Sequence, residues 1–320
     1  MKIVCWRFQK RWVKILESVT LASLVGCTQL ASGTDRGEPL MTAPPPDPAW
    51  DCLSEPPKVP DLPANPPDYI AFVVPIFDVA HPPSAVPDLK VEACQVSDAD
   101  CTAPLPAPAY SRMDVPQPGV PVPIPTYIIV FPYTPMITWY LKLTTPPPAD
   151  PKAFPDYLPF EYYFEGPLVQ PNGDPLPNGI PAVYGQPINM LSAKDADRFA
   201  AGIKQTRDTT AAIIALRAMD CTGTPAAGVR LTLDPNVGIP FTFLSSLALS
   251  TDPPAPTDAS GILGFANIPL PLPNTTSLTP TVTLQGISPD SVNYGEIAAR
   301  IRPGQVTSGE IRPFPTLSGR

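Results

Sequence analysis

The side chains best suited to chemistry in this chain are its six cysteines, and Cys27 stands in the most distinctive surroundings. It follows Leu24-Val25-Gly26 at the end of a short apolar run, residues 18–26. A segment with five Lys and Arg residues precedes that run. A basic segment, a short apolar segment and small residues at a cleavage point are typical of a secretory signal. The sulfur of a cysteine at that point can accept a lipid.

The sequence Leu24-Val25-Gly26-Cys27 resembles the lipobox of bacterial lipoproteins. The resemblance implies that residues 1–26 are removed, that Cys27 carries a thioether-linked diacylglycerol, and that its new amine is acylated. Two or three acyl chains give durable anchoring, because each buried CH₂ contributes about 0.8 kcal/mol. Thr28, in place of an Asp, resembles the sorting pattern for the outer membrane. We therefore expect an outer-membrane lipoprotein that faces the periplasm or the cell exterior.

Two alternatives to lipidation stay open at this point. An ordinary signal peptide can also end in a cysteine, and Glu17 stands at the edge of the apolar run. An uncleaved membrane anchor fits less well, because the run is far shorter than the roughly 20 apolar residues that span a bilayer.

The charge of the chain argues against nucleic acid as a partner. The formal net charge is −8, and the pI is about 4.7. Residues 1–26 hold five basic residues and one acidic residue, a net +4, so their removal takes the charge from −8 to −12. Such a chain lacks the basic footprint of a nucleic-acid-binding protein. Attachment to a membrane would therefore depend on the lipid at Cys27.

Four cysteines remain after the signal and Cys27, and they are Cys52, Cys94, Cys101 and Cys221. An even number in an exported chain indicates disulfides. Cys94 and Cys101 flank a polar loop, so a local bridge is expected there, and Cys52 then pairs with Cys221 by elimination. A zinc site is the rival interpretation, but the spacing does not match a zinc knuckle and His81 is the only histidine.

Fifty-one prolines limit the regular structure that this chain can form. Proline disrupts helix interiors and central strands, so it must collect in connections, turns and strand edges. Residues 28–68 hold several Pro-Pro pairs and no apolar periodicity, which indicates an extended spacer. About 40 residues at about 3.1 Å each reach on the order of 120 Å. Trp50 and Cys52 suggest that the middle of this spacer docks on a folded domain.

The first folded unit begins near Tyr69 and has the pattern of a β-sandwich, because short apolar runs alternate with turn signals. Strands are expected at residues 69–77, 89–94, 126–131, 136–144 and 160–164, with a turn at 114–119.

A second irregular stretch, residues 167–187, precedes the one credible helix, at about 193–204. Ser192 is an N-cap residue with Asp195 three positions later. The apolar residues of the helix share one face, and they are Ala196, Phe199, Ala200 and Ile203. We expect this helix to pack between the domains.

The second unit contains two segments with a recognisable pattern, CTGTPAAGVRL at 221–231 and TDASGILGFANIP at 257–269. Together with the later Arg302-Pro-Gly, they resemble carboxypeptidase regulatory-like domains, which are small transthyretin-like β-sandwiches. The resemblance implies about seven strands and places Phe265 in the core. Those strands are expected at 209–219, 228–233, 241–244, 265–268, 281–286, 297–301 and 305–311. The first unit shows a thinner version of the pattern, and the whole resembles a surface lipoprotein with tandem domains of this kind.

The expected fold is therefore all-β, with two transthyretin-like β-sandwich domains, a Pro-rich N-terminal tether and one short helix between the domains. The expected divisions are a signal peptide at 1–26, the tether at 27–68, the first sandwich at 69–168, a linker with the helix at 169–207 and the second sandwich at 208–320.

The single histidine argues against the enzymes that use related β-sandwiches. Intradiol dioxygenases hold ferric iron with two Tyr and two His, and hydroxyisourate hydrolases need several His. His81 precedes two prolines in an expected loop, which is a poor position for a catalytic triad. No phosphate loop, dinucleotide fingerprint or zinc motif occurs. We expect no catalytic residue, no cofactor and no metal.

Two Asp-x-Asp pairs, Asp98/Asp100 and Asp195/Asp197, raise the question of a cation site. Calcium takes six to eight oxygen ligands, so two carboxylates alone are far too few. Solvated loop acids explain the first pair better, and helix capping explains Asp195.

The candidates for ligand contact are two pairs of neighbouring aromatic residues, Trp139 with Tyr140 and Tyr162 with Tyr163. Neighbours on a strand face opposite sides, so one ring of each pair could lie on an outer face. Exposed rings suit stacking on sugars or contact with a protein. The alternative is that all four rings belong to the core or pack against the tether.

These patterns together predict a non-enzymatic, membrane-anchored lipoprotein with a binding or structural scaffolding role in the cell envelope. The alternative is a carbohydrate-binding surface module of a polysaccharide-handling system. The expected partners are the membrane, through the lipid at Cys27, and an envelope protein or polysaccharide.

Overall fold

Short strands between Pro-rich connections predict an all-β chain, and a computed structural model confirms that class. It describes residues 50–53, 67–79, 84–86, 88–105, 110–115, 124–133, 139–146, 156–163, 175–244, 248–251 and 253–313. These residues form three sheets, one short α-helix and a 3₁₀ turn, η2 (Asp51–Leu53). The signal peptide, Cys27, His81 and most of the tether lie outside the described residues.

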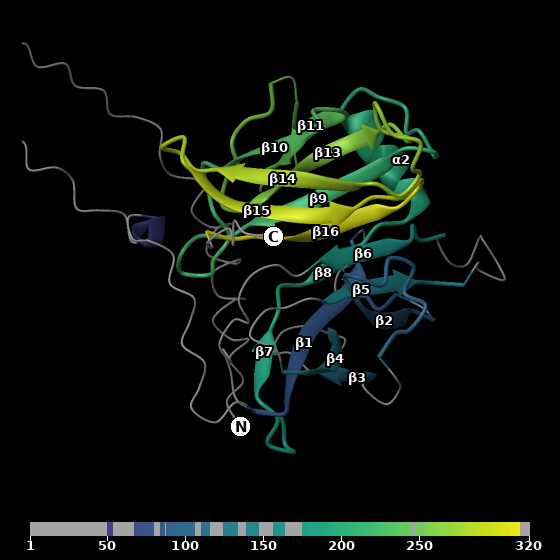
Figure 1. The fold of residues 1–320 in the computed structure, drawn as a ribbon, viewed down its shortest axis with the longest axis vertical. Helices are drawn as coiled ribbons and strands as arrows, with labels where there is room; N and C mark the ends of the chain where they lie inside the picture. Colours follow the sequence, from purple (N-terminus) through teal and green to yellow (C-terminus); the bar gives the residue numbers. More distant parts are fainter. Residues whose placement is uncertain are drawn as a thin grey trace, which may run out of the picture.

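The central element is an eight-stranded sheet that both halves of the chain build (Figure 1). In order across the sheet, its strands are β12 (Leu249–Ser250), β11 (Ile239–Phe243), β13 (Ile262–Ile268), β9 (Ala212–Ala218), β16 (Val306–Ile311), β6 (Phe160–Tyr163), β5 (Trp139–Thr144) and β2 (Lys90–Gln95). β16 pairs in parallel with β6 on one side and with β9 on the other. The last strand that the structure describes therefore joins the two halves.

A five-stranded sheet packs against the part of the shared sheet formed by β2, β5 and β6. Its strands are β3 (Tyr110–Val115), β4 (Ile124–Pro132), β1 (Tyr69–Asp78) and β7 (Ala182–Tyr184) in that order, with β8 (Ile188–Met190) also paired to β1. Ile129 and Leu141 are fully buried in the first core between the two sheets. We call this half the first sandwich.

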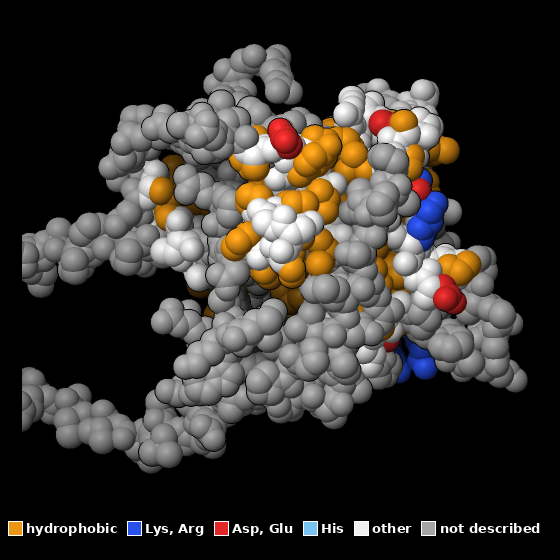
Figure 2. Space-filling view, turned by 90° about the horizontal axis from the view of Figure 1, so that it is seen from below, with side chains coloured by type: hydrophobic (Ala, Val, Ile, Leu, Met, Phe, Trp, Pro, Cys, Tyr) orange, Lys and Arg blue, Asp and Glu red, His pale blue; other side chains and the backbone are white. Residues whose placement is uncertain are grey.

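The outer face of the five-stranded sheet is also apolar. Ala71 and Val73 of β1 form a small buried cluster there with Ile128 of β4 and Ala182 of β7. Seen from below, the molecule shows apolar side chains near the middle of the view (Figure 2). The continuous apolar run of β1 is explained by burial on both of its faces.

A three-stranded sheet covers the other part of the shared sheet and completes the second sandwich. Its strands are β10 (Arg230–Asp234), β14 (Thr281–Ile287) and β15 (Asn293–Arg300). Phe265 lies in the second core, with 3% of its surface exposed, as the sequence pattern predicts.

The two cores lie on opposite faces of the shared sheet. On β6, Phe160 and Tyr162 belong to the first core, whereas Tyr163 belongs to the second. On β16, Val306 belongs to the first core and Ile311 to the second. Successive side chains of a strand alternate between its faces. The five-stranded and three-stranded sheets therefore cover opposite sides of one layer.

The predicted helix is confirmed as α2 (Ala193–Gly202). The side-chain oxygen of Ser192 accepts a hydrogen bond from the backbone N–H of Asp195 at 3.1 Å, so the predicted N-cap is also confirmed. Ala196 packs into the first core, while Phe199 and Ile203 pack against strands of the second sandwich. The helix thus contacts both sandwiches.

The sequence pattern missed four short strands, β3, β7, β8 and β12. β3 extends through Val115, into the expected turn at 114–119, and β7 and β8 lie in residues 169–207, expected to form a linker. β7 and β8 both pair in parallel with β1. Three-residue strands at a sheet edge are too short to show alternation, and prolines surround them. The division into domains stays a prediction.

Candidate functional site

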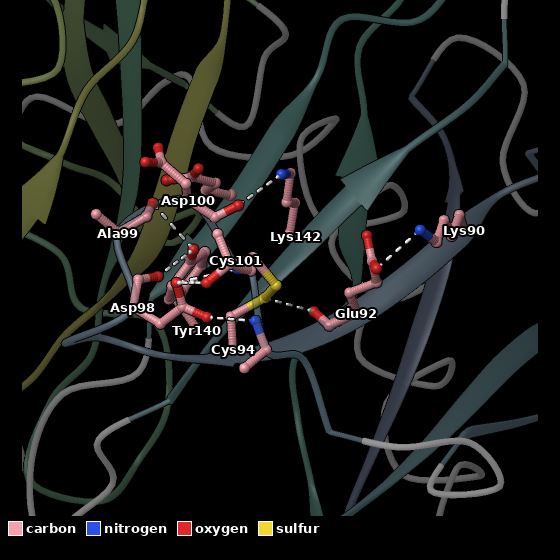
Figure 3. Close-up of a disulfide and its surroundings, with 12 residues drawn as sticks. Lys90, Glu92, Cys94, Asp98, Ala99, Asp100, Cys101, Tyr140 and Lys142 are labelled. Carbon is pink, nitrogen blue, oxygen red and sulfur yellow. Dashed lines mark hydrogen bonds and ion pairs between the residues drawn. A yellow bond between two sulfur atoms is a disulfide. The ribbon is translucent and has the colours of Figure 1, made fainter.

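The predicted disulfide between Cys94 and Cys101 closes a polar loop at the end of β2 (Figure 3). Asp98 organises this loop, because its carboxylate accepts hydrogen bonds from the backbone N–H of Thr102 at 3.0 Å and of Ala103 at 2.8 Å. These bonds, the one from Thr102 above all, hold the pKa of Asp98 below its usual value of 3.8. The carboxylate of Asp98 is therefore committed to the loop itself.

Two stacked tyrosines on neighbouring strands support this loop. The rings of Tyr140 and Tyr163 have centroids 5.2 Å apart and planes within 11° of each other. The Tyr140 hydroxyl donates toward the carbonyl oxygens of Asp98 and Ala99, at 3.1 and 3.3 Å. Burial, reinforced by the negative charge of Glu161, raises the pKa of Tyr140 to about 12. At neutral pH the hydroxyl keeps its proton and ties the loop to the sheet.

Glu161 is buried beside these rings, with 1% of its surface exposed. Its Oε2 accepts a hydrogen bond from the Tyr163 hydroxyl at 2.8 Å, and its Oε1 accepts one from Nε of Arg302 at 3.1 Å. Arg302, between β15 and β16, also pairs with Asp100 at 3.1 Å and donates to the carbonyl oxygen of Ala99. This junction network connects the disulfide loop that follows β2 to the connection between β15 and β16.

The carboxylate of Glu161 has its hydrogen-bond partners within the junction network. Both carboxylate oxygens of Glu161 are occupied, and a buried carboxylate needs such partners because an unpaired buried charge is very costly. A general acid or base must instead exchange its proton with a substrate within hydrogen-bond reach. Among the described residues, no group of three or more His, Cys, Asp or Glu side chains could hold a metal ion.

A second ionic cluster lies on the opposite face of the same strands. Glu310 of β16 accepts hydrogen bonds from the Tyr162 hydroxyl at 3.1 Å and from Nε of Arg312 at 2.9 Å. Burial, with a smaller contribution from the charge of Glu310, raises the pKa of Tyr162 well above its usual value. Arg217 stands opposite Glu310 in the ladder, and its buried Nε has no hydrogen-bond partner among the residues that the structure describes. Side chains therefore link β6 to β16 on this face of the sheet, and β6 to the connection between β15 and β16 on the other.

None of the four aromatic candidates lies on an exposed face, so the alternative of core packing describes them. The exposed fractions are 7% for Trp139, 0% for Tyr140, 5% for Tyr162 and 2% for Tyr163. The predicted alternation holds, since Trp139 and Tyr162 belong to the first core and Tyr140 and Tyr163 to the second. The rings on either face are shielded from solvent, because both faces of the shared sheet are covered here. The four rings build the junction and offer no surface for stacking on a sugar.

The second predicted disulfide, Cys52–Cys221, is also confirmed. It joins the middle of the tether to the connection between β9 and β10, with the two Cα atoms 5.7 Å apart. Trp50 and Leu53 pack against the second core, as expected for a docked segment. The tether therefore meets the second sandwich before it enters the first.

The acids of α2 also have structural roles. Asp195 caps the helix and pairs with Arg198, and Asp197 pairs with Arg207 at 2.7 Å. The structure does not bring these acids to Asp98 or Asp100 as a common cation site. No helix among the described residues has the length and apolar character needed to cross a membrane.

Sequence reasoning did not single out Glu161 or Arg302 as site residues. One signal for Glu161 was present, because it is an acid inside an otherwise aromatic strand, Phe160-Glu161-Tyr162-Tyr163. A charge in such a position requires a buried partner. Its partner Arg302 is far away in the chain; Arg302-Pro-Gly belongs to the pattern of the family resemblance, but no local pattern pairs Arg302 with Glu161.

Comparisons with known proteins identify no family. No family model matches the chain, and no curated protein matches it. A solved structure described as the Bacillus anthracis TIE protein is similar at 11% identity, with a TM-score of 0.21. The alignment covers 77% of this chain and 34% of that one, so this chain spans about a third of its length. A likeness at this level says nothing about function.

Proposed function

We propose that this chain is a lipid-anchored, non-enzymatic protein of the outer membrane, with a scaffolding or binding role in the cell envelope. The observation that carries the proposal is the lipobox at residues 24–27, followed by a Pro-rich tether and a disulfide-linked β body. Protein disulfides persist in oxidising compartments such as the periplasm and the cell surface. The paired cysteines and the lipobox therefore point to the same location.

The construction of the body favours a scaffold. Sliding of the two sandwiches would break the pairing of β6 with β16 and the ion pair of Glu161 with Arg302. A joint built from a shared sheet is stiffer than a loop between separate domains, which by default allows relative motion. Such a body suits the task of holding a partner at a fixed position near the membrane.

The second sandwich is proposed to be a carboxypeptidase regulatory-like domain. The turn at its signature segment supports this proposal, because Gly261 has a φ of +66° and the carboxylate of Asp258 accepts a hydrogen bond from the backbone N–H of Ser260 at 2.8 Å. Only glycine adopts that backbone angle readily. Phe265 then enters the core, as this pattern requires.

Lipidation at Cys27 is tested by metabolic labelling of the full chain with a clickable palmitate analogue in a bacterial host that makes an outer membrane. We expect label on the wild type and on a Cys5→Ala control, and none on Cys27→Ala. We also expect the labelled protein in the outer-membrane fraction. Equal labelling of the Cys27→Ala variant would overturn the anchor.

The ligand class is tested by retention of residues 28–320 on purified envelope before and after protease treatment of that envelope. The scaffolding proposal expects retention that protease abolishes, because the partner is then a protein. Retention that survives protease would favour the carbohydrate-binding alternative instead. That alternative would need contact residues other than Trp139, Tyr140, Tyr162 and Tyr163, since all four are buried.

A further inference from the structure

The Cys52–Cys221 bond determines where the N-terminal tether meets the folded body. Its attachment involves more than the sulfur atoms. The backbone N–H of Cys52 donates to Sγ of Cys221 at 3.2 Å, and Leu53 N–H donates to the carbonyl oxygen of Trp50 at 3.0 Å in the η2 turn. Trp50 and Leu53 are partly buried against the second core. The tether segment at 50–53 is thus part of the second sandwich.

The other partner of this bond stands in a firmly organised connection. The carboxylate of Asp220 accepts hydrogen bonds from the backbone N–H groups of Thr222, at 2.8 Å, and Thr224, at 3.0 Å. Hydrogen bonds from side chains of the same two threonines to Asp220 are 2.7 Å long. The backbone N–H of Met219 donates to the carbonyl oxygen of Ile311 at 2.9 Å, which ties the connection to β16. A pull on Cys52 therefore acts on the shared sheet itself.

The bond also shortens the length of chain between Cys27 and the first described attachment of the tether to the body. From Cys27 to Cys52 the chain advances 25 residues, which at about 3.1 Å per residue reach about 80 Å. From Cys27 to Pro67, at the start of the first sandwich, it advances 40 residues, with a reach of about 120 Å. The anchored end of the chain therefore reaches the second sandwich first, although the first sandwich comes earlier in the sequence.

We propose that the Cys52–Cys221 bond makes the second sandwich the membrane-proximal part of the anchored protein, with the first sandwich farther from the lipid. This inference rests on the proposed lipid anchor at Cys27. The surface that faces the lipid is the connection between β9 and β10 around Cys221. The tether, and not charge, brings this surface close to the membrane, since the chain is acidic overall.

The test compares two exposed positions on the full lipidated protein in vesicles of phosphatidylethanolamine and phosphatidylglycerol. A clickable amino acid replaces Ala227, in the connection that follows Cys221, or Tyr69, at the start of β1, which is 53% exposed. A donor dye at each position transfers energy to an acceptor dye on a small fraction of the lipid headgroups. The matched variant carries Cys52→Ser with Cys221→Ser, so that the tether first meets the body near Pro67.

We expect higher energy transfer from position 227 than from position 69, and a loss or reversal of that order in the double serine variant. Equal transfer from both positions in vesicle-bound wild type, or an unchanged order in the variant, would overturn the proposed orientation while leaving the anchor in place. Failure of the wild type to float with vesicles would overturn the anchor, and this orientation with it. A Cys27→Ala chain sets the background transfer.

Discussion

At the scale of single residues, Glu161 is the side chain on which the junction depends most. It lies in a strand of aromatic residues, where its charge has no water to solvate it. Arg302 and Tyr163 are its polar partners instead, and Arg302 also pairs with Asp100. The network around Glu161 thus brings together three separate segments of the chain, which contain Asp100, Glu161 and Arg302.

Replacement of Arg302 by Met is expected to destabilise the protein by roughly 3–5 kcal/mol, because it leaves the buried carboxylate of Glu161 without its cation. The double change Glu161→Gln with Arg302→Met should recover much of that loss, since Gln keeps an acceptor for Tyr163 without the charge. The free energy of unfolding in urea measures both. As a control, Arg198→Met removes an exposed ion pair and should cost at most about 1 kcal/mol. Equal losses for Arg302→Met and the control would contradict this role of Arg302.

The lowered pKa of Asp98 predicts an acid-sensitive loop. Its carboxylate stabilises the folded loop fully at pH values above the usual 3.8, and this contribution disappears as the pH falls through the lowered folded value. Asp98→Asn should therefore lower the melting temperature at neutral pH, and the difference from wild type should close in stronger acid. An Asp290→Asn control, at an exposed position, should follow the wild type throughout. A constant difference at every pH would argue against the carboxylate as the cause.

At the scale of elements, the alternation of side chains along a strand is predicted correctly, but it does not show whether each face of the sheet is exposed or buried. The alternation in β5 and β6 correctly assigned Trp139 and Tyr140 to opposite faces. A single sandwich would leave one of those faces in solvent. In this fold a second core covers it, and that core is formed by strands more than a hundred residues away, such as β14.

The sequence therefore predicts the existence of most elements, the helix cap and both disulfides, but not how the elements assemble. Apolar runs in β1, β4 and β9, and the alternation of apolar and polar residues in β14, can be recognised locally. The parallel pairing of β6 with β16 depends on register and shape between distant segments, and no local pattern reports it. The same limit hid Arg302, whose importance appears only beside Glu161.

Loss of the cap of α2 should destabilise the protein. Ser192→Ala removes the acceptor for the backbone N–H of Asp195 and is expected to cost about 0.5–2 kcal/mol. Ser192→Thr keeps a hydroxyl and should cost less. Urea unfolding of the two variants measures the difference. A larger loss for threonine than for alanine would show that packing around this buried position outweighs the cap.

At the scale of the whole molecule, the two disulfides restrain very different lengths of chain. Cys94–Cys101 spans a separation of 7 residues, whereas Cys52–Cys221 spans 169 and encloses the entire first sandwich. A crosslink removes more entropy from the unfolded chain when the loop that it closes is longer.

Removal of Cys52–Cys221 by alanine at both positions is expected to cost more stability than removal of Cys94–Cys101. The chain-entropy model gives about 5 kcal/mol for the long loop and about 2.5 kcal/mol for the short one. Urea unfolding of the oxidised protein and the two double variants measures the order. If loss of the short bridge proves the more costly, the junction network that its loop holds must dominate over chain entropy.

The position of β16 between β6 and β9 also has a consequence for the folding of the newly synthesised chain. A chain that crosses a membrane from its N-terminus delivers β2, β5 and β6 early, but β6 has an unpaired edge until residues 306–311 emerge. Open strand edges invite pairing with other chains. For a chain exported as proposed, we expect both halves to finish folding only once β16 has emerged, and a chain truncated before Val306 to be lost to aggregation or proteolysis.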